Sequence, residues 1–341
     1  MPWVSGLLGV AILVYVLRGF RLERFVEVLD EADLRFLLLL PAALLAEQTL
    51  RAWKWRQLLA PFARVGPLRL LGSIMAGQLL AILIPLGVGA VARSWLVARR
   101  ERLELPTVLA TVAVDRLVDG VVFALLVPVA LLSVAFVDQA GIRGLLFWIG
   151  TGSFVLLSTL LLLLVRSQDG LLAAEGRMVR TAGRLPFGVG ERAVGMAAAF
   201  ARGGAWPREP RRGLRVVGAS LLIKPLAATH FLWAGLAFGV VLEPGDYLFL
   251  LVCLGFVGIL GYFARAAGSF LLGAVFALGL LGVAEEQALA MALAVEGTNL
   301  LSIALIGALA LWQQGVALAE ADLDPSVLEG PGPRRIHEGQ G

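Results

Sequence analysis

The stretch "GLLFWIGTGSFVLLSTLLLLLV", residues 144–165, decides the class of fold. Its 22 residues carry no charged side chain. About 20 apolar residues are enough for a helix to cross the hydrocarbon core of a bilayer. Other long apolar runs occur along the chain, and the alternating pattern of a membrane β-barrel strand is absent. The sequence therefore predicts an all-α, polytopic membrane protein with about six full spans and two broken or re-entrant hairpins.

Composition agrees with this class and narrows the function. Of the 341 residues, 59% are hydrophobic and 16% are charged, whereas soluble domains average about 45–50% and about 25%. With two histidines and one cysteine, Cys253, the chain has little with which to build a metal centre. No zinc spacing, nucleophile elbow or Walker loop is present. We therefore expect no metal, no cofactor, no nucleic-acid partner and no enzymatic activity.

The order of apolar and polar segments predicts five parts. The long polar insert that follows residue 165 reads as two short amphipathic helices and a linker. We expect a first span and an interfacial helix over residues 1–35, a first repeat unit over 36–137, a linking span and basic cytoplasmic insert over 138–213, a second repeat unit over 214–314, and a disordered tail over 315–341.

A similar pattern of residues recurs at an offset of 181 positions and predicts an internal structural repeat. Gly87 corresponds to Gly268, and Asp115 corresponds to Glu296. In each half an apolar run meets a glycine break, then a short run, then a long helix that carries an acid. The residues that mark the two breaks are Pro85, Gly87, Gly89 and Gly268. Weak internal symmetry of this kind is typical of transporters.

The distribution of basic residues predicts that the two units are inverted. Residues 166–215 carry ten arginines, so this insert should be cytoplasmic. The loop at residues 243–246 has no Lys or Arg and should lie outside. Residues 70–98 would then enter and leave from the cytoplasm, and residues 247–283 from outside. Four arginines within residues 18–35 count against this arrangement.

Three ionisable groups interrupt the apolar stretch at residues 111–136. Asp115 and Asp119 are four residues apart, and Arg116 and Asp119 are three apart, so they can share a helix face. A charge at the bilayer centre costs between ~2.5 and more than 10 kcal/mol. We expect Arg116 to neutralise Asp119. The group is either a structural network that fixes helix packing or the wall of a polar cavity.

Further polar residues are candidates for a substrate path. Arg93 follows the first break, where backbone amides and one arginine suit a lipid phosphate. The alternative is an arginine that snorkels to the interface. Glu296 and Asn299 are three residues apart on the last span and could face a cavity.

Two basic residues flank a pair of tryptophans near the end of the second span. Arg51 and Arg56 lie on either side of Trp53 and Trp55. Aromatic and basic residues commonly gather where a helix leaves the membrane. Interface anchoring is the role that we expect for all four residues, and Arg51 and Arg56 are also secondary candidates for the substrate path.

Secondary candidates lie in the second half. Lys224 precedes Pro225 inside an apolar run, and either snorkels or faces the path. His230 is either a hydrogen-bonded packing residue or a proton relay. Arg265, beside the second break, loosely mirrors Arg93.

Four motifs carry a resemblance to a known family. They are "RAWKWRQLL" (51–59), "PLGVGAVARSWLV" (85–97), "AVDRLVDG" (113–120) and "GVAEEQALAMALAVE" (282–296). With these motifs the chain resembles the lysylphosphatidylglycerol synthase transmembrane region, or flippase-like integral membrane family, over about residues 1–315. The resemblance implies a translocator of lipids such as aminoacylated phospholipids or glycolipids. The family more often has glutamate where Asp115 stands, and the second break lacks the expected proline.

The leading hypothesis is a translocator of an anionic-headgroup lipid in the bacterial cytoplasmic membrane, with membrane lipids as its partners. Arg93 would hold the headgroup, while Asp115, Arg116, Asp119 and Glu296 would line the path. Because no soluble aminoacyl-transferase domain follows, we expect no lipid synthesis. The alternative is a non-transporting scaffold that docks a lipid- or glycan-transferring enzyme on its basic insert.

Overall fold

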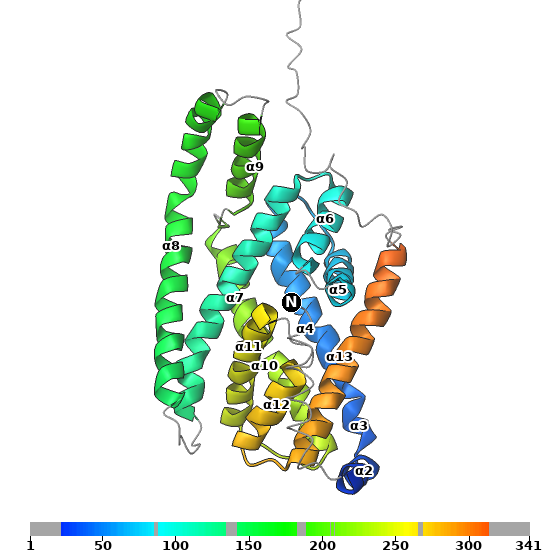
Figure 1. Ribbon diagram of the computed structural model, residues 1–341. Helices are drawn as coiled ribbons and strands as arrows, with labels where there is room; N and C mark the ends of the chain where they lie inside the picture. The colour runs from blue at the N-terminus through cyan, green and yellow to red at the C-terminus, as the bar shows by residue number, and fades with distance from the viewer. Residues whose placement is uncertain are drawn as a thin grey trace, which may run out of the picture. The chain divides into compact units, whose positions relative to one another are not determined.

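The elements of the computed structural model are helices throughout the part of the chain that it describes, residues 22–84, 88–133, 142–182, 189–204, 206–207, 209–264 and 269–313 (Figure 1). The predicted all-α class is confirmed. The helices are α2 (Leu22–Asp30), α3 (Leu34–Leu37), α4 (Leu39–Leu59), α5 (Pro67–Leu83), α6 (Gly89–Glu101), α7 (Leu105–Ser133), α8 (Ile142–Ala182), α9 (Val189–Gly203), α10 (Pro210–Ala237), α11 (Pro244–Ala264), α12 (Ser269–Leu280) and α13 (Glu285–Gln313).

Five segments of the described residues are long and apolar enough to cross a membrane, which confirms a polytopic integral membrane protein. The first predicted span lies outside the described residues. Helices α5 and α12 and most of α11 are apolar but shorter. The five segments are Leu34–Leu59, Leu105–Ser133, Gly144–Leu163, Pro210–Ala237 and Glu285–Gln313.

The short helices form the two predicted hairpins, because α5 contacts α6 and α11 contacts α12 (Figure 1). A close approach of two glycines sets the first hairpin. A Cβ atom on Gly77 would lie 2.8 Å from both the Arg93 Cβ and the Gly89 carbonyl oxygen. Small residues at a helix crossing let the backbones approach in this way. The other break residues, Pro85, Gly87 and Gly268, lie outside the described residues.

The chain divides into two compact units that are each discontinuous in sequence. Unit 1 comprises Met1–Arg51, Leu117–Thr159 and Arg215–Leu305, and unit 2 comprises Ala52–Arg116, Leu160–Leu214 and Ile306–Gly341. The boundaries of the five predicted parts, the inverted repeat and the orientation in the membrane stay predictions.

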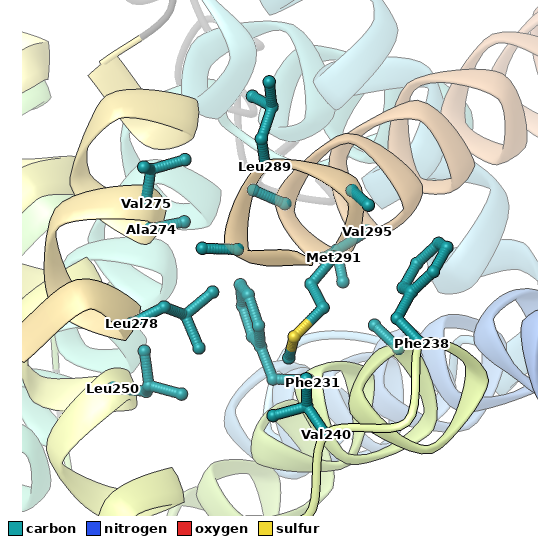
Figure 2. Close-up of a cluster of buried hydrophobic side chains, with 14 of the residues drawn as sticks. Phe231, Phe238, Val240, Leu250, Ala274, Val275, Leu278, Leu289, Met291 and Val295 are labelled. Atoms are coloured by element: carbon teal, nitrogen blue, oxygen red, sulfur yellow. The ribbon is translucent and has the colours of Figure 1, made fainter. Parts of the chain in front are cut away.

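The core of unit 1 is built from α10, α11, α12 and α13 (Figure 2). Phe231, Leu250, Leu278 and Met291 are among its fully or almost fully buried side chains. Burying a side chain of this size contributes about 1.5–3 kcal/mol relative to leaving it in water. In a bilayer the apolar contribution is smaller, and dense packing carries more of the stability. This core holds the walls of the cavity described below.

Unit 2 holds part of the basic insert against the start of α7. The Thr107 hydroxyl donates to the Ala199 carbonyl over 3.0 Å. Arg202 on α9 pairs with Glu104 at 3.0 Å. Gly203 leaves no room for a Cβ atom beside the Thr107 carbonyl. Helix α9 is therefore fixed at its C-terminal end.

Two short helices were predicted in the insert, and this prediction is wrong for the first of them. Helix α8 continues from the apolar run through Ala182 as one helix of 41 residues. The polar segment after Val165 contains no proline until Pro186 and is rich in Leu, Ala and Arg. These residues favour a helix, so the loss of apolar character does not end it.

The first hairpin gives a direct test of its packing. Gly77→Ala should lower the free energy of unfolding by about 1–3 kcal/mol, because the new methyl group must displace the Gly89 backbone. Gly218→Ala, in α10 where a Cβ would meet nothing within 4 Å, should instead stabilise by up to about 1 kcal/mol. Thermal unfolding in detergent measures both. A Gly77→Ala variant as stable as Gly218→Ala would contradict the packing described.

Candidate functional site

Unit 1 contains two adjoining pockets of different character, which together are called the cavity and singly its compartments. The apolar compartment, about 450 Å³, is lined from α7, α10 and α11 and the chain between α10 and α11. The polar compartment, about 250 Å³, adds residues of α4, α12 and α13. Both volumes together fall within the range of small-molecule sites. Lys224, Ala228, Tyr247 and Leu251 line both compartments and form their common wall.

The polar side chains of the polar compartment are mainly donors. Arg51, Lys224, His230, Tyr247 and Asn299 line it, each with a group that can donate a hydrogen bond. Among the described residues that line it there is no aspartate or glutamate. Charges attract more strongly in an interior of low dielectric constant than in water. The lining of the compartment therefore offers hydrogen-bond donors to an anion, and the nearest carboxylates lie behind Arg51 and His230.

The apolar compartment suits a hydrocarbon chain. Its walls include Leu126, Leu221, Leu232 and Leu248. Leu221 and Pro225 are exposed on the surface of α10, so the compartment reaches the apolar face of that helix. Because proline has no N–H, the Leu221 carbonyl lacks its usual helical donor at Pro225.

Lys224 stands at the junction of the compartments. Its Nζ lies 5.7 Å from the centroid of the Phe123 ring, a cation–π contact. Such a contact contributes about 0.5–2 kcal/mol, with the upper part of the range for desolvated sites. A charge-assisted hydrogen bond contributes about 1.5–3 kcal/mol. An anion that accepts a hydrogen bond from the ammonium group would therefore gain more than the ring contact contributes.

Arg51 is held by a chain of acidic groups behind the polar compartment. Its Nη2 and Nε lie 2.7 and 2.8 Å from Glu47 Oε1. Its Nη1 lies 3.6 Å from Asp119 Oδ2, and Asp119 Oδ1 accepts from the Ser220 hydroxyl over 2.9 Å. Glu47 Oε2 also lies 3.6 Å from His230 Nε2. The guanidinium is therefore oriented before any ligand arrives.

Unit 2 contains a second buried ionic cluster. Lys54 Nζ lies 2.8 Å from Asp115 Oδ1, and Lys54 has 0% exposure. Arg93 Nη2 lies 3.8 Å from Asp115 Oδ2, and the guanidinium stacks 5.1 Å over the Trp55 ring. Trp55 Nε1 donates to the Thr111 hydroxyl over 3.0 Å. These contacts pack Asp115 and Arg93 together inside the unit.

The structure corrects one predicted pair. Asp115 and Asp119 are both buried, but the Arg116 side chain is exposed. Asp119 pairs with Arg51 of α4, so the predicted Arg116–Asp119 pair is wrong. Spacing along a helix permitted that pair, but a cation from a neighbouring helix approaches the carboxylate instead.

Arg93 and the tryptophans also differ from expectation. The Arg93 side chain is buried and contacts Asp115, so the snorkelling interpretation is wrong. Its contact with a lipid phosphate stays a prediction. Trp55 is 1% exposed and is a core residue rather than an interface anchor. Trp53 is half-buried, and Arg56 is exposed on α4, where anchoring stays a prediction.

The second-half candidates divide between the cavity and its surroundings. Lys224, His230 and Asn299 line the polar compartment, whereas Glu296 is half-buried on α13 and is not among its lining residues. Arg265 lies outside the described residues.

Sequence reasoning missed four residues of these clusters. Glu47 stands four residues before Arg51, a spacing that could have indicated the pair. Lys54 lies within the motif at residues 51–59, but the motif alone does not indicate a pair with Asp115. Ser220 and Tyr247 have no signal in the sequence, because only the packing of α7, α10 and α11 brings them to the site.

The comparison with family models decides the family. The model described as "Lysylphosphatidylglycerol synthase TM region" matches residues 3–307. The chain belongs to this family. Its members share a membrane domain of lipid-related proteins, in agreement with the apolar helices and the two-compartment cavity. Neither the comparison with curated proteins nor that with solved structures gave a match.

The cluster in unit 2 can be tested against the exposed neighbour of Asp115. Asp115→Ala leaves Lys54 without its 2.8 Å partner and should lower the free energy of unfolding by about 3–5 kcal/mol. Arg116→Ala removes an exposed charge and should change it by less than about 0.5 kcal/mol. Thermal unfolding in detergent compares the two variants. Equal losses would show that Asp115 is not held as described.

Proposed function

We propose that this chain moves an anionic-headgroup lipid across the bacterial cytoplasmic membrane. The observation that carries the proposal is the cavity of unit 1, in which an apolar and a polar compartment share one wall. A lipid has the same division into hydrocarbon and charged headgroup. Family membership supports a lipid-related role.

The headgroup would enter the polar compartment while hydrocarbon occupies the apolar one. Lys224, in the common wall, would meet the phosphate where the two parts of the lipid join. Arg51, already oriented by Glu47, would supply a planar set of donors that matches two phosphate oxygens. Both cations are half-buried, which makes the attraction stronger than at an open surface. No step requires covalent chemistry, so we propose transport rather than catalysis.

Translocation needs the headgroup to leave as well as to bind. A headgroup held by one lysine that has an alternative contact, the Phe123 ring, is released more easily than one held by fixed charges alone. The exchange of Lys224 between ring and phosphate lowers the cost of passing the headgroup through the apolar part of the membrane.

A leaflet-sidedness assay tests the proposal. Purified protein in phosphatidylcholine liposomes should bring fluorescent phosphatidylglycerol from the inner leaflet within reach of an external quencher faster than protein-free liposomes do. Lys224→Gln should slow this movement at least about tenfold, the effect of losing ~1.4 kcal/mol of headgroup interaction. The matched control is Arg24→Gln, which removes an exposed cation of α2 in the same unit.

Three outcomes would contradict the proposal. Wild-type protein that moves phosphatidylglycerol no faster than empty liposomes would favour the scaffold, whose enzyme partner the basic insert would hold. Equal movement of fluorescent phosphatidylcholine would remove the selectivity for an anion. Equal loss in Lys224→Gln and Arg24→Gln would remove the assignment of the site.

A further inference from the structure

We propose that each phosphodiester lipid crosses the membrane together with one proton, which the His230–Glu47 pair carries. This inference rests on the proposed function and adds the coupling of lipid movement to proton movement. His230 lines the polar compartment, and its Nε2 lies 3.6 Å from Oε2 of Glu47 behind it. Both residues are buried, at 7% and 6% exposure.

Helices α4, α7, α10, α11 and α13 contribute the other polar groups around the His230–Glu47 pair. Glu47 and Arg51 come from α4, where Glu47 Oε1 pairs with the guanidinium. A histidine beside a carboxylate is the side-chain pair best suited to bind and release a proton near neutral pH. The remaining polar groups of the surroundings are Asp119 of α7, Lys224 of α10, Tyr247 of α11 and Asn299 of α13.

An anion in the polar compartment changes the proton balance of this pair in one direction. A phosphate that approaches Arg51 shares the guanidinium with Glu47, so the carboxylate loses part of its counter-charge. The phosphate also brings a negative charge close to His230. Both effects favour the protonated form of the pair. By linkage, a proton on the pair must then strengthen the binding of the phosphate to the same extent.

The proposed cycle balances atoms and charge. A phosphodiester carries one negative charge, and one proton from the water on the entry side binds to His230 Nε2 or to Glu47. The headgroup and the proton cross together, and both leave on the opposite side. No net charge moves, so the membrane potential does not oppose the step. A difference in pH across the membrane then drives the lipid in the direction in which protons flow.

One other group could produce part of this behaviour, and the variants must separate it from the His230–Glu47 pair. Lys224 would also bind an anion more weakly on losing a proton at high pH, so the sign of the effect alone does not identify the carrier. His230→Gln removes the titrating ring but keeps a polar side chain. The matched control is His337→Gln, because His337 is the second histidine of the chain and lies outside the described residues.

The first measurement uses proteoliposomes with fluorescent phosphatidylglycerol and an imposed pH difference. An acidic exterior should raise the inward flux of the wild type and of His337→Gln. It should leave the flux of His230→Gln unchanged. A potential imposed with potassium and valinomycin should not change the flux of the wild type or of His337→Gln, but it should change that of His230→Gln, whose lipid crosses without a compensating proton. Wild-type movement that ignores the pH difference would overturn the coupling while leaving the proposed translocation intact. Absence of any phosphatidylglycerol movement would overturn the translocation.

The second measurement tests the coupling by ligand binding to the wild-type protein, so it remains informative if His230→Gln does not transport or does not fold. The binding of short-chain phosphatidylglycerol to wild-type protein in detergent should tighten as the pH falls, by at most about tenfold per unit for one linked proton. At the pH where the affinity changes most steeply, the protein should take up close to one proton from a weakly buffered solution for each lipid that it binds. Glu47→Gln, if folded, should show a smaller slope. Wild-type binding that takes up no proton at any pH would overturn the inference.

Discussion

The ion pair between Glu47 and Arg51, one turn apart on α4, is the contact on which the site in unit 1 depends. Two nitrogen atoms of the guanidinium lie 2.7 and 2.8 Å from one carboxylate oxygen. A buried charge that loses its partner costs several kcal/mol, so neither side chain can turn away without a replacement. The pair therefore fixes the direction of Arg51 toward the polar compartment. It also leaves the second oxygen of Glu47 facing His230 and a nitrogen of Arg51 facing Asp119.

The two cations of the polar compartment are held by different contacts. Arg51 lies against carboxylates, whereas the Lys224 ammonium lies 5.7 Å from the centroid of the Phe123 ring. In the proposed function, Arg51 would provide a fixed position for the headgroup, and Lys224, in the common wall, would meet the phosphate between headgroup and hydrocarbon. In unit 2 the cluster around Asp115 is deeply buried, with Lys54 wholly enclosed, and its contacts join residues of α4, α6 and α7.

The sequence predicted the features that depend on local composition. Uninterrupted apolar runs identified the membrane class, and the glycine breaks identified both hairpins. The apolar residues around Asp115 and Asp119 agree with the burial of both carboxylates. Partners were harder, because a carboxylate on α7 can be reached from several helices and only packing decides which cation arrives. The partner of Asp119 is therefore Arg51 and not Arg116. Trp55 is a core residue, although tryptophans near the end of a span commonly lie at an interface. Lys224 and His230 stood out in the sequence as secondary candidates. Their common cavity could not be predicted, because a cavity is a property of several helices together.

The most direct test of the account is a structure of the protein with phosphatidylglycerol whose acyl chains carry bromine. We predict density for the phosphate between Arg51 and Lys224, with the Lys224 ammonium moved off the Phe123 ring, and bromine density in the apolar compartment. A lipid bound with its phosphate away from both cations, or with bromine only on the outer surface of the helices, would contradict the central claim that the two compartments of unit 1 form one lipid site.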